Sequence, residues 1–201
     1  MIELFEKYGC EKIWHRYNEL YQPDFEPLRE KPINILEVGT FRGESVNVWL
    51  EYFTEAKIYT IDTFERVHPA DLPMLDNPRV THAKLDSTAK ECNDYFKNLN
   101  IKFDFIIDDG LHTPDAQRKT FENLIEFTDT YYIEDVWNLE KINMKHPEIV
   151  RWFESKWSPD VQEFTKEKYN RLLDTISKYK VTHYDWRTKK RQDSYILKVE
   201  K

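Results

Sequence analysis

The sequence is poor in the residues that mark several large protein classes. It has two cysteines, Cys10 and Cys92, which are too few for a disulfide framework and lack the spacing of a metal-binding motif. It has no apolar run of about 18 residues, so it predicts no transmembrane helix. The stretch MIELFEKYGC carries acidic side chains where a signal peptide needs a basic start and an apolar core. From these absences we expect a cytoplasmic protein.

Basic residues are also in short supply. The formal net charge is −7, and nucleic-acid binders and proteins held on anionic lipid both need basic surface. We therefore expect neither a nucleic acid nor a membrane as a partner. The hydrophobic fraction of 40% and the charged fraction of 33% are ordinary for a globular chain, and 201 residues fit one domain with a full core.

What the sequence does contain is a regular alternation of short apolar runs and amphipathic segments. The apolar runs predict strands, and the segments with apolar residues at helical spacing predict helices. The predicted strands are 33–38, 57–62, 79–86, 103–108, 130–135, 181–187 and 194–200. The predicted helices are 2–21, 43–53, 88–99, 114–127, 145–157 and 160–179, the first ending at QPDFEPLREKP.

This order predicts an α/β fold with a mainly parallel seven-stranded sheet, helices on both faces and an antiparallel pair of strands at the C-terminal end. We expect a single domain over 1–201, with an N-terminal helical segment at 1–30 and the sheet-bearing core at 31–201. In such sheets the ligand lies beyond the carboxyl ends of the strands.

Glycine is scarce, and its placement points to a ligand. The chain has four glycines, and three of them, Gly39, Gly43 and Gly110, follow predicted strands. Asp62 ends the second strand, where a carboxylate can accept the hydroxyls of a ribose. A dinucleotide site would need three closely spaced glycines, but bulky Phe41 stands in this turn. The acid before the turn, Glu37, suits a cationic ligand such as S-adenosylmethionine, which carries an ammonium and a sulfonium.

Two acidic pairs follow neighbouring strands. FIIDDGLH ends in Asp108 and Asp109 with His112 three residues later, and YYIED ends in Glu134 and Asp135. Such carboxylates repel one another unless a cation or a set of donors compensates them. A divalent cation held by oxygen ligands, with a histidine nearby to take a proton, would explain the pattern.

The stretches ILEVGTFRGES, AKIYTID, FDFIIDDGLH and YYIED together resemble the successive motifs of the class I S-adenosylmethionine-dependent methyltransferases. They are most similar to the metal-dependent sugar O-methyltransferases of the macrocin and mycinamicin type and to the cephalosporin-hydroxylase-like family. The match spans about residues 12 to 137. The resemblance implies a Rossmann-like methyltransferase fold, with S-adenosylmethionine and a divalent cation, usually Mg²⁺, as cofactors.

The resemblance also implies roles for individual residues. Cofactor contacts fall on Glu37, Gly39, Thr40, Phe41, Gly43, Asp62, Thr63, Asp86, Ser87 and Asp108; the metal ligands are Asp109, Glu134 and Asp135; and His112, with Asp109, is catalytic. The other histidines show no cluster and are expected to be structural or exposed. Trp14, Tyr17 and Tyr21 are interpreted as a packing face.

The implied activity is methylation of a hydroxyl on a sugar or a saccharide-containing small molecule, by a chain that can form a homo-oligomer. Two alternatives stay open. One is a non-catalytic module that binds S-adenosylmethionine and assists a partner enzyme. The other is a Rossmann-like enzyme that uses a nicotinamide cofactor.

Overall fold

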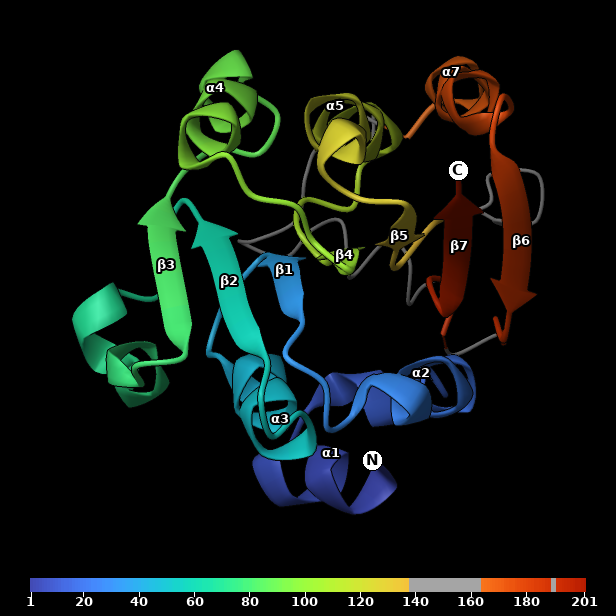
Figure 1. Cartoon of the computed structure of the whole chain (residues 1–201). Helices are drawn as coiled ribbons and strands as arrows, with labels where there is room; N and C mark the ends of the chain where they lie inside the picture. The colour runs from blue at the N-terminus through green and yellow to red at the C-terminus, as the bar shows by residue number, and fades with distance from the viewer. Residues whose placement is uncertain (138–163, 189–190) are drawn as a thin grey trace.

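A computed structural model describes residues 1–137, 164–188 and 191–201, and these residues form one seven-stranded sheet (Figure 1). The strand order is β3-β2-β1-β4-β5-β7-β6. The strands are β1 Asn34–Val38, β2 Lys57–Asp62, β3 Val80–Lys84, β4 Phe105–Asp108, β5 Thr130–Ile133, β6 Lys180–Asp185 and β7 Tyr195–Glu200. The first five are parallel, and β7 runs antiparallel to both β5 and β6. The predicted fold class is therefore confirmed.

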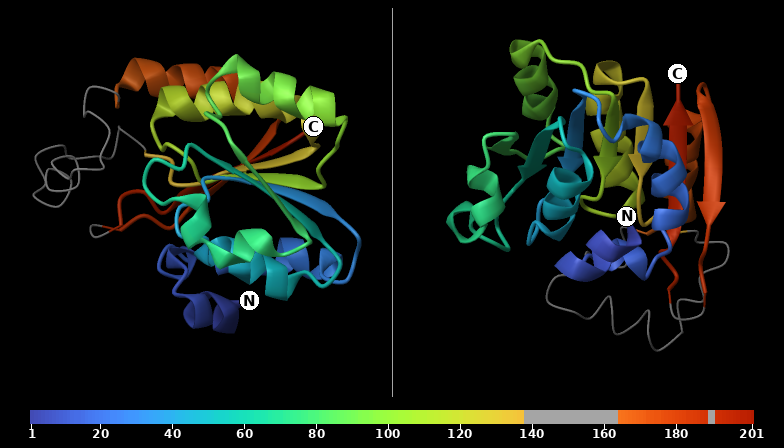
Figure 2. Two further views of the ribbon diagram at one scale, coloured as in Figure 1. Left: turned by 90° about the vertical axis from the view of Figure 1, so that its left-hand side faces the viewer. Right: turned by 60° about the horizontal axis from the view of Figure 1, so that its bottom comes forward.

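Helices cover both faces of the sheet (Figure 2). On one face lie α4 Lys90–Leu99, α5 Pro114–Leu124 and α7 Lys166–Ile176. On the other lie α1 Ile2–Tyr8, α2 Asn18–Phe25 and α3 Glu44–Tyr52. Because both faces are covered, β4 is buried along its whole length, which explains why its sequence is a continuous apolar run. Among the described residues, no helix combines the length and the apolarity needed to cross a membrane.

The face covered by α1 to α3 has an aromatic core. Phe25 of α2 stacks on Phe105 of β4 with ring centroids 4.3 Å apart, and Trp49 of α3 meets the Phe25 ring edge-on at 5.8 Å. Tyr21 of α2 contacts Tyr132 of β5 at 5.4 Å in the same way. These rings attach the N-terminal segment to the centre of the sheet.

The expectation of a single helix over 2–21 is wrong. The segment is divided into α1, a 3₁₀ turn η1 (Glu11–Ile13) and α2. Gly9 ends α1 with φ of 65°, and Arg16 takes φ of 64° before α2 begins. The prediction that the helix stops at Gln22 is also wrong, because α2 passes Pro23 and reaches Phe25. Burial of Tyr21 and Phe25 against the sheet offsets the hydrogen bond that proline cannot donate.

Near the C-terminus the described residues support part of the predicted pattern. The predicted helix at 145–157 lies outside the described residues, as do the first positions of the predicted helix at 160–179, whose later part is α7. The predicted antiparallel pair is confirmed as β6 and β7, with Lys180 opposite Glu200.

The aromatic layer predicts a large effect for one truncation. Phe25→Ala removes a fully buried ring from between α2, α3 and β4, so we expect the free energy of unfolding to fall by about 3–5 kcal/mol in urea denaturation. Leu99→Ala, at a side chain that is 44% exposed, is the control and should cost less than about 1 kcal/mol. A Phe25→Ala variant as stable as this control would contradict the described packing.

Candidate cofactor and metal site

A cavity of about 990 Å³ lies at the carboxyl ends of the parallel strands. The segment between α1 and α2 contributes part of its lining. Most of the residues expected at a site line it: Gly39, Thr40, Phe41, Asp62, Thr63, Asp86, Ser87, Asp109, His112, Glu134 and Asp135. The other three expected residues, Glu37, Gly43 and Asp108, are not part of its described lining. The convergence follows from the parallel sheet, which brings the strand ends to one edge.

The turn after β1 depends on a glycine. Gly39 has φ of 92°, and a Cβ atom at this position would lie 2.1 Å from the carbonyl oxygen of Asp109. No other residue fits here, because the first turn and the end of β4 are in backbone contact. Gly43, with φ of 74°, precedes α3 and leaves space that the Met74 side chain occupies.

Asp62 at the end of β2 holds this turn in place. Its Oδ2 accepts hydrogen bonds from the backbone N–H groups of Thr40 at 2.8 Å and Phe41 at 3.0 Å. Its Oδ1 accepts from the N–H of Phe64 at 2.7 Å. Each carboxylate oxygen has two lone pairs, so Oδ1 keeps capacity for a ligand hydroxyl. Asp62 therefore fixes the backbone of this turn where it lines the cavity.

Glu37 lies behind the turn rather than in the cavity. It is fully buried, its Oε2 accepts from the Ser45 hydroxyl at 2.7 Å, and its Oε1 lies 3.5 Å from the Nζ of Lys12. Burial raises the pKa of Glu37, and the Lys12 ammonium opposes that rise. Glu37 thus connects β1, the start of α3 and the N-terminal segment.

Asp108 also lies under the cavity floor. Burial raises the pKa of Asp108 to about 7, while its oxygens accept from the Gly110 N–H and the Tyr131 hydroxyl, each at 3.3 Å.

At the far end of the cavity, Asp86 accepts hydrogen bonds from the backbone N–H and the hydroxyl of Thr88.

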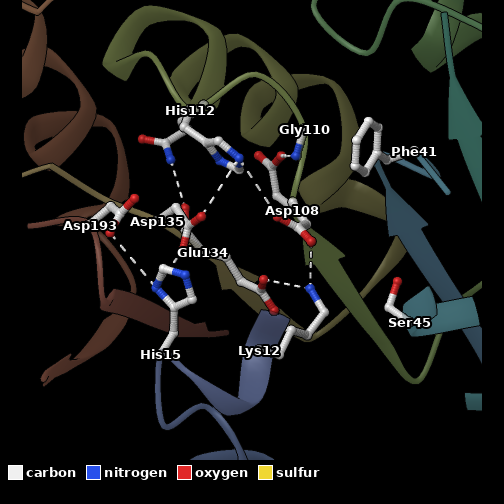
Figure 3. A network of polar contacts seen from close by, with 12 residues as sticks. Lys12, His15, Phe41, Ser45, Asp108, Gly110, His112, Glu134, Asp135 and Asp193 are labelled. Carbon is white, nitrogen blue, oxygen red and sulfur yellow. Dashed lines mark hydrogen bonds and ion pairs between the residues drawn. The ribbon is translucent and has the colours of Figure 1, made fainter. Parts of the chain in front are cut away.

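The acidic pairs are compensated by a lysine that the sequence analysis did not single out. Lys12 Nζ lies 2.5 Å from Asp109 Oδ2 and 2.6 Å from Glu134 Oε2 (Figure 3). Burial alone would lower the pKa of Lys12, but Asp109, Glu134 and Glu37 raise it well above its ordinary value. A positive charge is therefore fixed inside the acidic cluster.

Two tyrosines of the same segment complete the contacts. The Tyr21 hydroxyl donates to Glu134 Oε1, and the Tyr17 hydroxyl donates to Asp135 Oδ1. Both oxygens of Glu134 thus face donors from the N-terminal segment. Tyr17 and Tyr21 do pack, as expected, but they also bind the acids. The expectation is wrong for Trp14, whose side chain is 54% exposed.

Two histidines flank Asp135. His112 Nε2 lies 3.7 Å from Asp135 Oδ2 and 3.7 Å from Asp109 Oδ1. His15 Nδ1 lies 3.8 Å from both Asp135 Oδ1 and Asp193 Oδ1, and 2.9 Å from the Ser194 hydroxyl (Figure 3). The expectation that His15 belongs to no cluster is therefore wrong.

The donor set fits a divalent cation. Asp109, His112 and Asp135 each offer one ligand atom, and these three atoms all lie within 4.8 Å of one another. The two carboxylates suit Mg²⁺ or Mn²⁺ with open positions left for water or substrate, and the imidazole lies beside them. Glu134, expected as a ligand, lies outside this group.

Comparisons with known proteins agree with this architecture. The MycE methyltransferase of the mycinamycin biosynthetic pathway, in complex with Mg and SAH, superposes with a TM-score of 0.66 over 98% of this chain and 53% of its own, at 22% identity. An O-methyltransferase from Bacillus cereus in complex with SAH gives a TM-score of 0.62 at 18% identity, covering 99% and 89%. The fold is that of the class I methyltransferases.

Curated relatives extend the similarity to sequence. One relative is the 8-demethyl-8-(2-methoxy-alpha-L-rhamnosyl)-tetracenomycin-C 3'-O-methyltransferase of Streptomyces olivaceus. It is 29% identical over 145 residues, covering 66% of this chain and 34% of the relative. The mycinamicin VI 2''-O-methyltransferase of Micromonospora griseorubida is 26% identical over 149 residues, covering 68% and 36%. The chain thus matches about a third of the length of these relatives. No family model matches.

Within this methyltransferase fold, the residues that sequence reasoning missed share one origin. Lys12, His15, Tyr17 and Tyr21 come from the segment that precedes β1 and contact the acids at the strand ends. The only signal in the sequence was a lysine and a histidine among the aromatic residues of a segment interpreted as amphipathic.

Proposed function

We propose that this chain is an S-adenosylmethionine-dependent O-methyltransferase that requires a divalent cation and acts on a hydroxyl of a sugar. The observation that carries the proposal is the group formed by Asp109, His112 and Asp135 in the same cavity as the turn after β1. The curated relatives named above are sugar O-methyltransferases, and the MycE complex contains Mg and SAH, which supports the same assignment.

The cofactor would occupy the side of the cavity between β1 and β3. The backbone from Gly39 to Phe41 forms its wall, and Asp62 has acceptor capacity for ribose hydroxyls. Asp86 and Ser87 line the far end, where the adenine would lie. Bound there, S-adenosylmethionine supplies the methyl group on a sulfonium leaving group.

His112 is proposed as the base. Its Nε2 faces two carboxylates at 3.7 Å, and these stabilise the ring once it has accepted a proton from the acceptor hydroxyl. Asp109 and Asp135 would hold the divalent cation, which lowers the pKa of a hydroxyl beside it. The hydroxyl oxygen would form a bond to the methyl carbon as its proton passes to His112, and the bond between that carbon and sulfur would break, releasing S-adenosylhomocysteine.

The mouth of the cavity favours a sugar as the acceptor. Five large apolar side chains are exposed among the described residues, and three of them, Trp14 (54%), Phe41 (44%) and Leu111 (50%), line this cavity. Exposed apolar groups that gather at one rim mark a binding surface. The aromatic ring of Trp14, with Arg191 5.3 Å from its centroid, presents a flat face and a donor, which suits the apolar face and the hydroxyls of a saccharide.

Cofactor binding is tested by thermal shift. Saturating S-adenosylhomocysteine should raise the melting temperature, because a ligand at 100 times its Kd stabilises the native state by about 2.7 kcal/mol. Asp62→Ala should lose most of this shift, and the exposed Asp94→Ala on α4 should keep it. A shift with NADH instead would favour the nicotinamide alternative, and no shift with either would overturn the proposal.

The chemical step is tested by removing the base. His112→Ala should lower kcat by about 10²–10⁴-fold in a methyl-transfer assay, while the thermal shift with S-adenosylhomocysteine stays unchanged. His82→Ala on β3, which does not line the cavity, should be as active as wild type. EDTA should stop turnover and Mg²⁺ should restore it. Cofactor binding without turnover on any glycoside in an acceptor panel would favour the non-catalytic module.

The acceptor surface is tested at Trp14. If the ring packs on the sugar, Trp14→Ala should raise the KM for a glycoside acceptor by about 10-fold and leave kcat within about 3-fold, because one stacking contact contributes about 1 kcal/mol or more. Trp14→Phe should recover much of the loss. Unchanged KM in Trp14→Ala would exclude this surface from acceptor binding.

A further inference from the structure

Lys12 occupies an unusual position for a lysine. It belongs to the short turn η1, outside the sheet, yet its side chain is only 5% exposed and its ammonium ends among three carboxylates. The contacts are Asp109 at 2.5 Å, Glu134 at 2.6 Å and Glu37 at 3.5 Å. Each carboxylate comes from the end of a different parallel strand, so one charge connects three strand ends.

The contacts of the acidic cluster fall into two parts, one around the Lys12 ammonium and one around His112. Asp109 is shared, because its Oδ2 accepts from Lys12 while its Oδ1 faces His112. Glu134 belongs wholly to the part around Lys12, because Lys12 donates a hydrogen bond to its Oε2 and Tyr21 donates one to its Oε1. Asp135 belongs to the second part, with Oδ2 facing His112. Among the oxygens of Asp109, Glu134 and Asp135, the two that face His112, Asp109 Oδ1 and Asp135 Oδ2, are the ones without a lysine or tyrosine donor.

We propose that Lys12 is a built-in counter-cation that withholds Glu134 from the divalent cation, so that the cation is held by Asp109 and Asp135 beside His112. This proposal rests on the metal requirement of the proposed function. It differs from the ligand set that the family resemblance implies, in which Glu134 also binds the metal. Lys12 is thus a positioning residue that sets both the number and the place of the metal ligands.

The physical reason is charge balance at short range. A divalent cation coordinated by Glu134 would lie within a few ångströms of the Lys12 ammonium, where like charges repel strongly in a buried setting. On the far side of Asp109 the cation instead faces Asp135, with Asp193 across His15. The cluster holds enough carboxylates for both the Lys12 ammonium and a divalent cation, provided that these two cations lie on opposite sides of Asp109.

Mn²⁺ binding followed by electron paramagnetic resonance tests the division without any turnover. We expect Glu134→Gln to bind Mn²⁺ within about 3-fold of wild type, and Asp135→Asn to bind it about 10–100-fold more weakly. Lys12→Met keeps the length of the side chain and removes its charge. It should bind Mn²⁺ at least about 10-fold more tightly than wild type, because the repulsion is gone and Glu134 is released.

Stability gives a second readout. Without metal, Lys12→Met leaves buried carboxylates uncompensated, so its melting temperature should fall by roughly 5–15 °C, and Mn²⁺ should recover most of the loss. Lys7→Met is the matched control, because Lys7 pairs with Glu51 at the surface, and it should change neither Mn²⁺ affinity nor melting temperature. If Lys12→Met does not fold, the comparison of Glu134→Gln with Asp135→Asn still decides the division.

The outcomes separate this proposal from the function on which it rests. Loss of Mn²⁺ in Glu134→Gln equal to that in Asp135→Asn, or Lys12→Met no tighter than wild type, overturns the role of Lys12 and leaves the metal requirement standing. A wild-type protein that binds no Mn²⁺, while S-adenosylhomocysteine still raises its melting temperature, overturns the metal requirement and the role of Lys12 together.

Discussion

The repulsion between the carboxylates at the ends of β4 and β5 is the constraint on which this structure depends. A parallel sheet places Asp109, Glu134 and Asp135 at one edge, where Glu134 is buried and its negative charge is costly. Donors from a distant segment of the chain compensate these charges. They are the ammonium of Lys12 and the hydroxyls of Tyr17 and Tyr21. The N-terminal segment is therefore part of the site as well as part of the core, and the two roles constrain each other.

The apolar pattern made the sheet predictable, and the parallel order then made the site predictable. Strands that stop at an acid or a glycine, such as β1 before Gly39 and β4 at Asp108, place those residues at a common edge regardless of the helices between them. This is why the turn after β1 and the acidic pairs could be expected to meet.

The contacts of the N-terminal segment could not be predicted in the same way. Lys12 lies 97 residues from Asp109 and 122 from Glu134, and no periodic pattern relates positions that far apart. The aromatic residues around it fit a helical repeat, which favoured one helix with a packing face. The left-handed backbone at Gly9 and Arg16 interrupts the expected helix. Lys12 and His15 lie between these two residues and contact the acids at the strand ends.

Tyr21 contributes both to the packing of the core and to the charge balance of the acidic cluster. Tyr21 packs edge-on against Trp49 and Tyr132 in the aromatic layer, while its hydroxyl reaches Glu134. The packing of α2 on the sheet therefore fixes where the Glu134 carboxylate lies, and Lys12 fixes its charge. Asp109 is left as the only carboxylate of the two acidic pairs in contact with both Lys12 and His112. A shift of the N-terminal segment would thus reach His112 through Asp109, so the geometry of the proposed base depends on the packing of rings that never enter the cavity.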